Sequence, residues 1–222
     1  MIAILDSGVD ASHPDLAGSV VPGYNAFDKT TDTRDVYGHG TKVAGAAAMA
    51  GNNLIGGTGV AFKASIMPIR VTDSAGYGYV SAMASGLVWA ADKGARVANL
   101  SFRNVCLHSS ILSAADYMRS KGGVVAGAAG NTGVEESIPP SESITCASAV
   151  DSADNKASFS SYGGYVDVAA PGVGIYTTTN GGGYGSVSGT SFAAPQVAAR
   201  VASLATRTGA GLDDALLEVL VS

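Results

Sequence analysis

The stretch "AILDSGVD", residues 3–10, shows the pattern that the rest of the chain repeats. The apolar run over 2–5 predicts a buried strand, and Asp6 follows directly at its end. Similar apolar runs predict strands over 64–71, 95–101, 124–130, 143–150 and 165–172. Between and after them, helices are predicted over 39–50, 79–94, 109–123, 190–207 and 212–222.

Strands that alternate with helices, each strand being a continuous apolar run, indicate an α/β fold. We expect one domain over 1–222, with a mainly parallel sheet that helices cover on both faces. Ser109 or Ser110 is the expected N-cap of the third helix. In such sheets the chemistry gathers at the carboxyl ends of the strands.

The composition excludes two classes of function. Hydrophobic residues make up 46% of the chain, charged residues 14%, and the net charge is −5 without a basic cluster. Nucleic-acid binding is therefore not expected, because phosphate contacts need surfaces rich in Lys and Arg. No apolar run approaches the roughly 20 residues that span a bilayer, and Met1 leads straight into a strand rather than a signal peptide.

The two cysteines are too few for a disulfide framework. Cys146 lies in "SITCASAV", a predicted buried strand, and we interpret it as a core thiol. Cys106 lies in a loop-like segment, and a bridge between the two stays open.

Three polar residues lie at the ends of predicted elements. Asp6 follows the first strand, His39 begins a helix in "YGHGTKVAG", and Ser191 begins another in "VSGTSFAAP". Taken singly, each has an ordinary structural interpretation as a turn former, a hydrogen-bonded histidine or a helix cap. Together they follow the order Asp, His, Ser, which is one of the chain orders known for the serine triad.

The motifs around these residues are "DSG" at 6–8, "HGTK" at 39–42 and "GTSFAAP" at 189–195. Together they resemble the motifs of the subtilisin-like serine proteases, the subtilases. The resemblance continues over essentially the whole chain, through "NLS" at 99–101, "AAGN" at 128–131, "ASFSSYG" at 157–163 and "AAPG" at 169–172. It implies a three-layer α/β/α sandwich around a mainly parallel sheet.

The resemblance also implies catalytic roles. Ser191 would be the nucleophile, His39 the base that takes its proton, and Asp6 the carboxylate that orients the imidazole. Asn131 would be the side-chain donor of the oxyanion hole. No cofactor is implied for catalysis.

For substrate, the resemblance implies an extended peptide paired with exposed backbone edges. The residues implied are Gly76, Tyr77, Gly78, Leu100, Ser101 and Phe102, with Ala129 and Gly130 beside the pocket for the P1 side chain, on the acyl side of the scissile bond.

Two features give conflicting indications about the P1 residue. Arg103 replaces a glycine often found in the family, which would narrow the pocket or favour an acidic or polar P1 residue. The carboxylates of Glu135 and Glu136 would favour a basic P1 residue, and the shortened segment 132–142 that carries them would open the pocket. The preference stays open.

The segment "GNNLIGGTGVA" at 51–61 resembles a subtilase calcium loop, with a plain glycine turn as the alternative. Oxygen ligands suit Ca²⁺. The family usually adds a ligand from a segment before the first strand, which this chain does not show, so the site would be weaker or lost. The implied ligands are the Asp15 carboxylate, the Asn53 side chain and the carbonyls of Gly51, Ile55 and Gly57.

Lys42 replaces the second histidine of the family motif. It would lower the basicity of His39 if close, and otherwise point to solvent, which we expect.

The sequence therefore predicts a serine endopeptidase acting through an acyl-enzyme. The alternative is a truncated, catalytically weak fold that binds peptides or a propeptide, because the chain looks trimmed at both ends relative to family members. A nucleotide-binding protein is excluded, since no G-x-G-x-x-G follows the first strand. The expected partners are polypeptide substrates and a propeptide or protein inhibitor, and we expect a secreted monomer.

Overall fold

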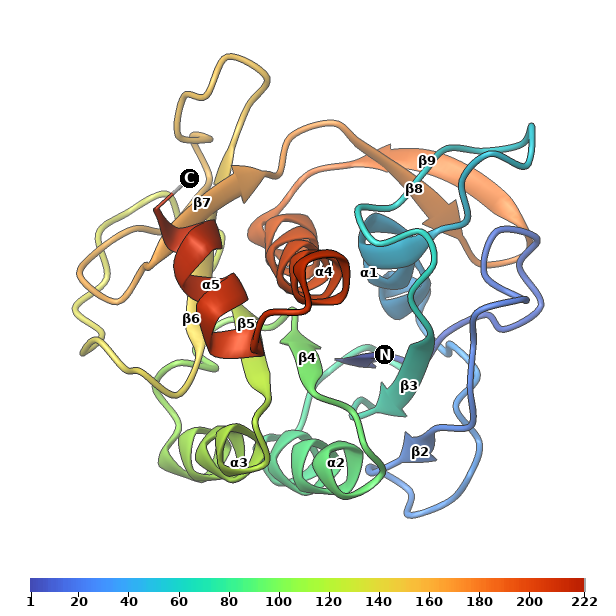
Figure 1. Cartoon of the computed structure of the whole chain (residues 1–222), viewed down its shortest axis with the longest axis horizontal. Helices are drawn as coiled ribbons and strands as arrows, with labels where there is room; N and C mark the ends of the chain where they lie inside the picture. Colours follow the sequence, from blue (N-terminus) through green and yellow to red (C-terminus); the bar gives the residue numbers. More distant parts are fainter. Residues whose placement is uncertain (222) are drawn as a thin grey trace.

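A seven-stranded parallel sheet forms the centre of the molecule (Figure 1). The computed structural model describes residues 1–221. The strands lie in the order β2-β3-β1-β4-β5-β6-β7, so the first strand of the chain is central. Their bounds are Ile2–Asp6 (β1), Tyr24–Asn25 (β2), Ile66–Arg70 (β3), Val97–Leu100 (β4), Val124–Ala128 (β5), Thr145–Val150 (β6) and Val168–Pro171 (β7).

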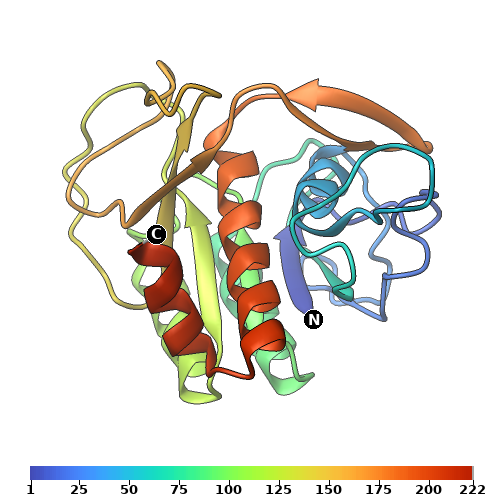
Figure 2. The ribbon, with the colours of Figure 1, turned by 45° about the horizontal axis from the view of Figure 1, so that its top comes forward.

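Helices cover both faces of the sheet (Figures 1 and 2). Helices α1, α4 and α5 lie on one face, and α2 and α3 lie on the other. The helices are His39–Ala48 (α1), Val80–Asp92 (α2), Ser109–Ser120 (α3), Thr190–Thr208 (α4) and Leu212–Leu220 (α5). This arrangement confirms the predicted three-layer sandwich.

Alternation along the strands builds the two cores. In β1, Ile2 and Ile4 pack with α1 and α4, whereas Ala3 and Leu5 pack with α2 and α3. Successive strand residues point to opposite faces. A central parallel strand is therefore apolar at both parities, and all of β1 is buried.

An antiparallel hairpin, Ile175–Thr179 (β8) and Gly183–Val187 (β9), was not predicted. Its strands carry threonine and glycine rather than an apolar run, so they lack the signal that identifies the central strands. The hairpin packs on α1, where the hydroxyls of Thr177 and Thr178 donate to the carbonyls of Lys42 and Thr41, both at 2.7 Å.

Gly45 is what allows that close packing. A Cβ at this position of α1 would overlap the hydroxyls of Thr177 and Thr178. The small-residue character of the helix is therefore needed to seat the hairpin, which closes one side of the molecule (Figure 2).

Two local predictions were wrong. Helix α3 begins at Ser109, so its N-cap is His108, which makes no capping side-chain hydrogen bond. Cys146 is not a free core thiol, because it is joined to Cys106 in a disulfide. Both cysteines are buried, and the bridge ties the segment after β4 to β6.

Candidate active site

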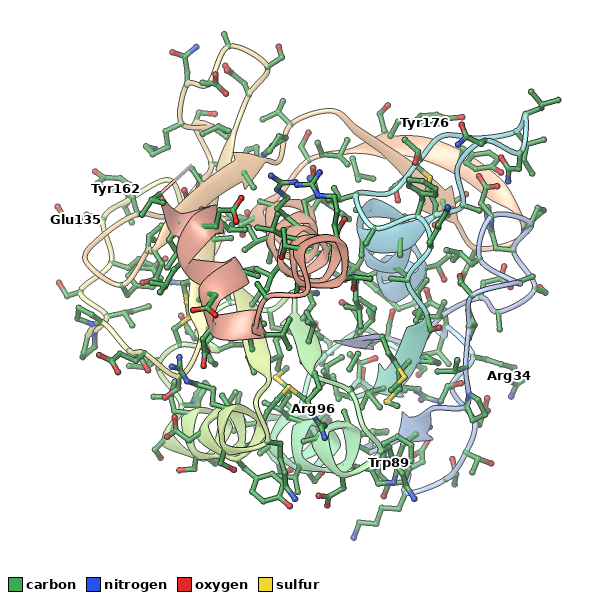
Figure 3. All side chains as sticks on the ribbon, viewed as in Figure 1. Arg34, Trp89, Arg96, Glu135, Tyr162 and Tyr176 are labelled. Atoms are coloured by element: carbon green, nitrogen blue, oxygen red, sulfur yellow. A yellow bond between two sulfur atoms is a disulfide. The ribbon has the colours of Figure 1, made fainter. Side chains whose placement is uncertain are left out.

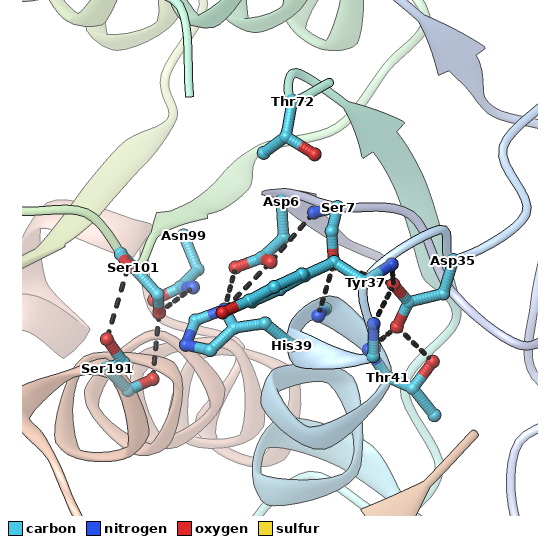
Figure 4. Close-up of polar contacts among 12 residues, drawn as sticks. Asp6, Ser7, Asp35, Tyr37, His39, Thr41, Thr72, Asn99, Ser101 and Ser191 are labelled. Carbon is cyan, nitrogen blue, oxygen red and sulfur yellow. Dashed lines mark hydrogen bonds and ion pairs between the residues drawn. The ribbon is translucent and has the colours of Figure 1, made fainter. Parts of the chain in front are cut away.

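Asp6 and His39 meet at the carboxyl end of the sheet. Asp6 is the last residue of β1 and only 1% exposed, and His39 is the first residue of α1. The imidazole Nδ1 lies 2.8 and 3.0 Å from the two carboxylate oxygens of Asp6 (Figure 4). With its proton on Nδ1, the ring keeps Nε2 free to accept another.

The surroundings shift the pKa of His39 upward. Burial lowers this pKa, but the charge of Asp6 and its hydrogen bond to the ring, together with the charge of Asp35, outweigh the burial. The imidazole is therefore a stronger base than an isolated histidine.

Asp35 organises the loop that leads into His39. Its carboxylate accepts hydrogen bonds from the Ser7 hydroxyl at 2.7 Å and from the backbone amides of Tyr37, Gly38 and Thr41 at 3.1, 2.7 and 2.8 Å (Figure 4). A carboxylate at a helix N-terminus satisfies free N–H groups and the helix dipole. Asp35 was not predicted to support the site, although an acidic residue just before a helix is a start signal.

Ser191 lies near the N-terminus of α4, next to the imidazole. The ring of its neighbour Phe192 is centred 5.7 Å from that of His39. Ser191 Oγ donates to the carbonyl of Ser101 at 3.2 Å. Among the described residues, no hydrogen bond joins Ser191 Oγ to His39. Catalytic hydrogen bonds are often long without substrate.

A proline in α4 frees a carbonyl that anchors this segment. Pro195 has no N–H to donate to the carbonyl of Ser191, four residues earlier. That carbonyl instead accepts the Ser101 hydroxyl at 2.8 Å, and Asn99 Nδ2 donates to the same hydroxyl at 2.9 Å. The end of β4 thus holds the start of α4.

Asn131 follows β5 and faces the same place. Its Oδ1 accepts the backbone N–H of Thr190 at 2.9 Å and the Thr190 hydroxyl at 3.0 Å. These two bonds fix the amide so that Nδ2 is its unengaged end. Nδ2 lies 3.6 Å from the place where a Cβ on Gly189 would be. The Asn131 amide therefore holds its N–H donors close to Gly189, which precedes Ser191 by two residues in the chain.

The predicted substrate segments face each other across the sheet end. A Cβ on Gly78 would lie 2.8 Å from the Phe102 ring, and one on Gly76 would lie 2.7 Å from the Tyr37 ring. Tyr77 is 71% exposed between them. Leu100, Ser101, Ala129 and Gly130 are buried beside Ser191 and Asn131. Pairing with a peptide along these edges stays a prediction.

The two glutamates that were expected to oppose Arg103 have separate environments. Glu135 is exposed at the outer edge of the molecule, near Tyr162 (Figure 3). Glu136 is turned inward, and its Oε1 lies 3.5 Å from Arg103 Nη2. Arg103 and Glu136 therefore form one charge pair rather than two competing charges.

The predicted calcium ligands Asp15 and Asn53 lie together. Asn53 Nδ2 donates to Asp15 Oδ1 at 2.6 Å, and the Tyr184 hydroxyl donates to Oδ2 at 2.9 Å. A Cβ on Gly56, where φ is +55°, would overlap Asp15 Oδ2, so only a glycine lets the loop close on this carboxylate. Within residues 1–221, no three His, Cys, Asp or Glu side chains gather as a metal site.

Lys42 is half-buried on α1. Its charge lowers the pKa of His39, and this is the smallest of the contributions to that pKa.

None of the helices within residues 1–221 combines the length and the apolar character that a membrane span requires.

A carboxylate–imidazole pair near a serine is the arrangement that serine proteases use on several unrelated folds. The family model "Subtilase family" matches residues 1–216, and the chain belongs to the subtilase family.

Named relatives agree with that class. The chain is 46% identical over 209 residues to "Thermitase" of Thermoactinomyces vulgaris, covering 93% of this chain and 75% of that protein. It is 44% identical over 208 residues to "Thermophilic serine proteinase" of Bacillus sp. (strain AK1), covering 93% of this chain and 52% of that protein. The chain thus spans about half of this second relative.

Solved structures support the fold. "Sphericase" superposes with a TM-score of 0.89 at 29% identity, covering 99% of this chain and 81% of that one. A "cold adapted subtilisin-like serine proteinase" gives a TM-score of 0.84 at 29% identity, with coverages of 97% and 78%.

Proposed function

We propose that this protein is a serine endopeptidase that hydrolyses peptide bonds through Asp6, His39 and Ser191. The observation that carries the proposal is the Asp6–His39 pair, in which the carboxylate holds Nδ1. Among the described residues Nε2 has no hydrogen-bond partner, and the ring lies close to Phe192 at the start of α4, next to Ser191 in the chain. Only a base with a free Nε2 can take the proton of a serine hydroxyl in this position.

In the proposed mechanism, Ser191 Oγ attacks the peptide carbonyl carbon while its proton passes to His39 Nε2. Asp6 stabilises the imidazolium, and Asn131 Nδ2 donates to the oxyanion. His39 then protonates the leaving amine as the C–N bond breaks, which leaves the acyl group on Ser191. A water molecule, deprotonated by His39, releases the acid and restores the serine.

An extended substrate would pair with 76–78 and 100–102, and a propeptide or protein inhibitor would lie in the same place. Because the attack needs Ser191 Oγ to leave the Ser101 carbonyl, substrate binding would complete the triad.

Labelling with a fluorophosphonate tests the proposal, with the adduct mapped by mass spectrometry. We expect a single adduct on Ser191 and a large drop in labelling in His39→Ala. As a matched control, His108→Ala, which changes the histidine before α3, should label normally. A folded protein that is not labelled would instead favour a peptide-binding module.

We also propose Ca²⁺ binding at the loop 51–57, through the Asp15 carboxylate, the Asn53 amide oxygen and the carbonyls of Gly51, Ile55 and Gly57. The buried Asp15 and the glycine-dependent closure of the loop support this. Bound calcium would hold the loop in place. Asn53 would then direct its amide oxygen, rather than its NH₂ group, toward the ion beside Asp15.

Thermal unfolding with calcium and with chelator tests this site. We expect calcium to raise Tm, and Asn53→Ala to remove most of that increase. Asn52→Gly is the control, because Asn52 has a φ of +63° that glycine adopts freely. An equal Tm with calcium and chelator would refute calcium binding.

A further inference from the structure

A charge pair that the catalytic steps do not use lies beside Asn131. Arg103 Nη2 is 3.5 Å from Glu136 Oε1, and the two residues come from the segments that follow β4 and β5. The disulfide from Cys106 anchors the segment that carries Arg103. The pair thus joins the segment after β4 to the segment after β5, and Ser101 and Asn131 of these segments contact the start of α4.

Glu136 is a mostly buried and ionised carboxylate. Its side chain is 11% exposed, and Oε1 accepts the hydroxyls of Thr132 at 2.7 Å and Ser161 at 2.8 Å. Burial raises its pKa, but these hydrogen bonds and the charge of Arg103 bring it below the ordinary value. Glu136 is therefore a fixed negative charge at the pH of a typical assay.

Arg103 reaches this carboxylate across the residue before Asn131. Its Cγ lies 3.4 Å from the place where a Cβ on Gly130 would be, and Gly130 N–H donates to Thr190 Oγ1 at 3.1 Å. Its side chain is 57% exposed, and within residues 1–221 it makes no hydrogen bond or ion pair beyond Glu136. A guanidinium has five donors, so most of them face solvent beside the catalytic residues.

The position of the P1 side chain follows from the proposed reaction. Its Cα is bonded to the carbonyl carbon that Ser191 attacks, whose oxygen points to Asn131 Nδ2. Its side chain must then leave between the segments 101–103 and 129–132, because Ser101 of the first contacts Ser191 and Asn131 of the second contacts Thr190, the residue before it. This is the surface over which the Arg103 side chain lies.

We propose that Arg103 and Glu136 determine the P1 preference: Arg103 selects acidic and amide side chains, and it masks a Glu136 charge that would otherwise select basic ones. This inference rests on the proposed function. A guanidinium pairs with a carboxylate through parallel hydrogen bonds, whereas a lysine or arginine at P1 would meet a like charge first.

The test uses peptides that differ only at P1, with Glu, Gln, Phe or Lys, and measures kcat/KM for each. The wild type should cleave after Glu and Gln faster than after Lys. Arg103→Gln should change the Glu-to-Lys ratio by about 10- to 100-fold in favour of Lys, since the Glu136 charge is then exposed to the substrate. Glu136→Gln should shift the ratio toward Glu.

Lys121→Gln is the matched control, because it removes one positive charge, as Arg103→Gln does. Lys121 directly follows α3 and pairs with Asp92 at the end of α2, at 3.9 Å. Its ratio should equal that of the wild type. Arg103 is half-exposed, so Arg103→Gln should fold even if Glu136→Gln does not. An unchanged ratio in active Arg103→Gln would overturn the inference, whereas the absence of both cleavage and Ser191 labelling would overturn the proposed function with it.

Discussion

In the Asp6–His39 half of the proposed site, the side chains and the loop are held by carboxylates, whereas in the Ser191–Asn131 half they are held by hydroxyls and amides. Asp6 binds the imidazole, and Asp35 binds the loop before it. Ser191 and Asn131 depend on Ser101 and Thr190.

Under the proposed mechanism, this difference predicts that the imidazole of His39 is held in place before substrate arrives, whereas Ser191 reaches its reactive position only when substrate binds. Hydrogen bonds to charged acceptors are about twice as strong as those between neutral groups. The histidine half should therefore be the more rigid, and its function should depend on charge and pH. The serine half should respond mainly to the loss of individual hydrogen bonds.

The largest effect is expected from Asp35→Asn. An amide in place of the carboxylate turns an NH₂ group toward at least one N–H donor of the loop, so a bond to a charged acceptor is lost. The cost should be about 1.5–3 kcal/mol of unfolding free energy. We also expect a fall in kcat, because His39 lies between Gly38 and Thr41, whose backbone amides both donate to Asp35.

The pH profile separates this role from simple stability. The charge of Asp35 raises the pKa of His39, so Asp35→Asn should lower that pKa and move the acid limb of kcat/KM to lower pH. Asp32→Asn, which breaks an exposed pair with Arg34, is the control and should leave both readouts nearly unchanged. An Asp35→Asn profile identical to that of the wild type would contradict the charge effect.

A smaller effect is expected from Thr190→Val. The change removes the hydroxyl that donates to Asn131 Oδ1 and accepts Gly130 N–H, but keeps the backbone N–H bond to Asn131. The amide of Asn131 then has one anchor. We expect about a tenfold loss in kcat, less than removal of the donor itself, and about 0.5–1.5 kcal/mol in stability.

Thr206→Val, on the same helix, is its control. The Thr206 hydroxyl donates only to the carbonyl of Ala202 at 2.8 Å, far along α4 from Asn131. An equal loss of kcat in the two variants would mean that Thr190 does not position Asn131. Unlike Asp35→Asn, Thr190→Val should leave the acid limb in place.

The same comparison explains what the sequence could predict. Asp6, His39 and Ser191 could be singled out because each lies at the end or start of a predicted element, and a parallel sheet brings such ends together. Their proposed roles came from the order Asp, His, Ser and from the resemblance of the surrounding motifs to the subtilases. The supporting contacts have no such pattern. Asp35 is held to the hairpin by Asn180, which is 145 residues away, and the hairpin lacks an apolar run.

Which charged residues pair also could not be predicted from the sequence. Glu135 and Glu136 are adjacent in the sequence, yet Glu135 faces solvent, whereas Glu136 is mostly buried and pairs with Arg103. Cys106 and Cys146 gave no sign of pairing, because proximity depends on how β4, β5 and β6 lie in the sheet. The face to which a strand residue points follows from local alternation, whereas contacts between distant segments depend on the order of the strands in the sheet.

The smallest effect is expected from Lys42→Gln, which removes a charge without breaking a network. Lys42 lowers the pKa of His39, since a positive charge opposes protonation of the imidazole. Without it the pKa rises, a larger share of His39 is protonated at low pH, and the acid limb of kcat/KM should move to higher pH. The shift is therefore opposite in sign to that of Asp35→Asn. Added salt should reduce it, and Lys93→Gln on the far face should show none.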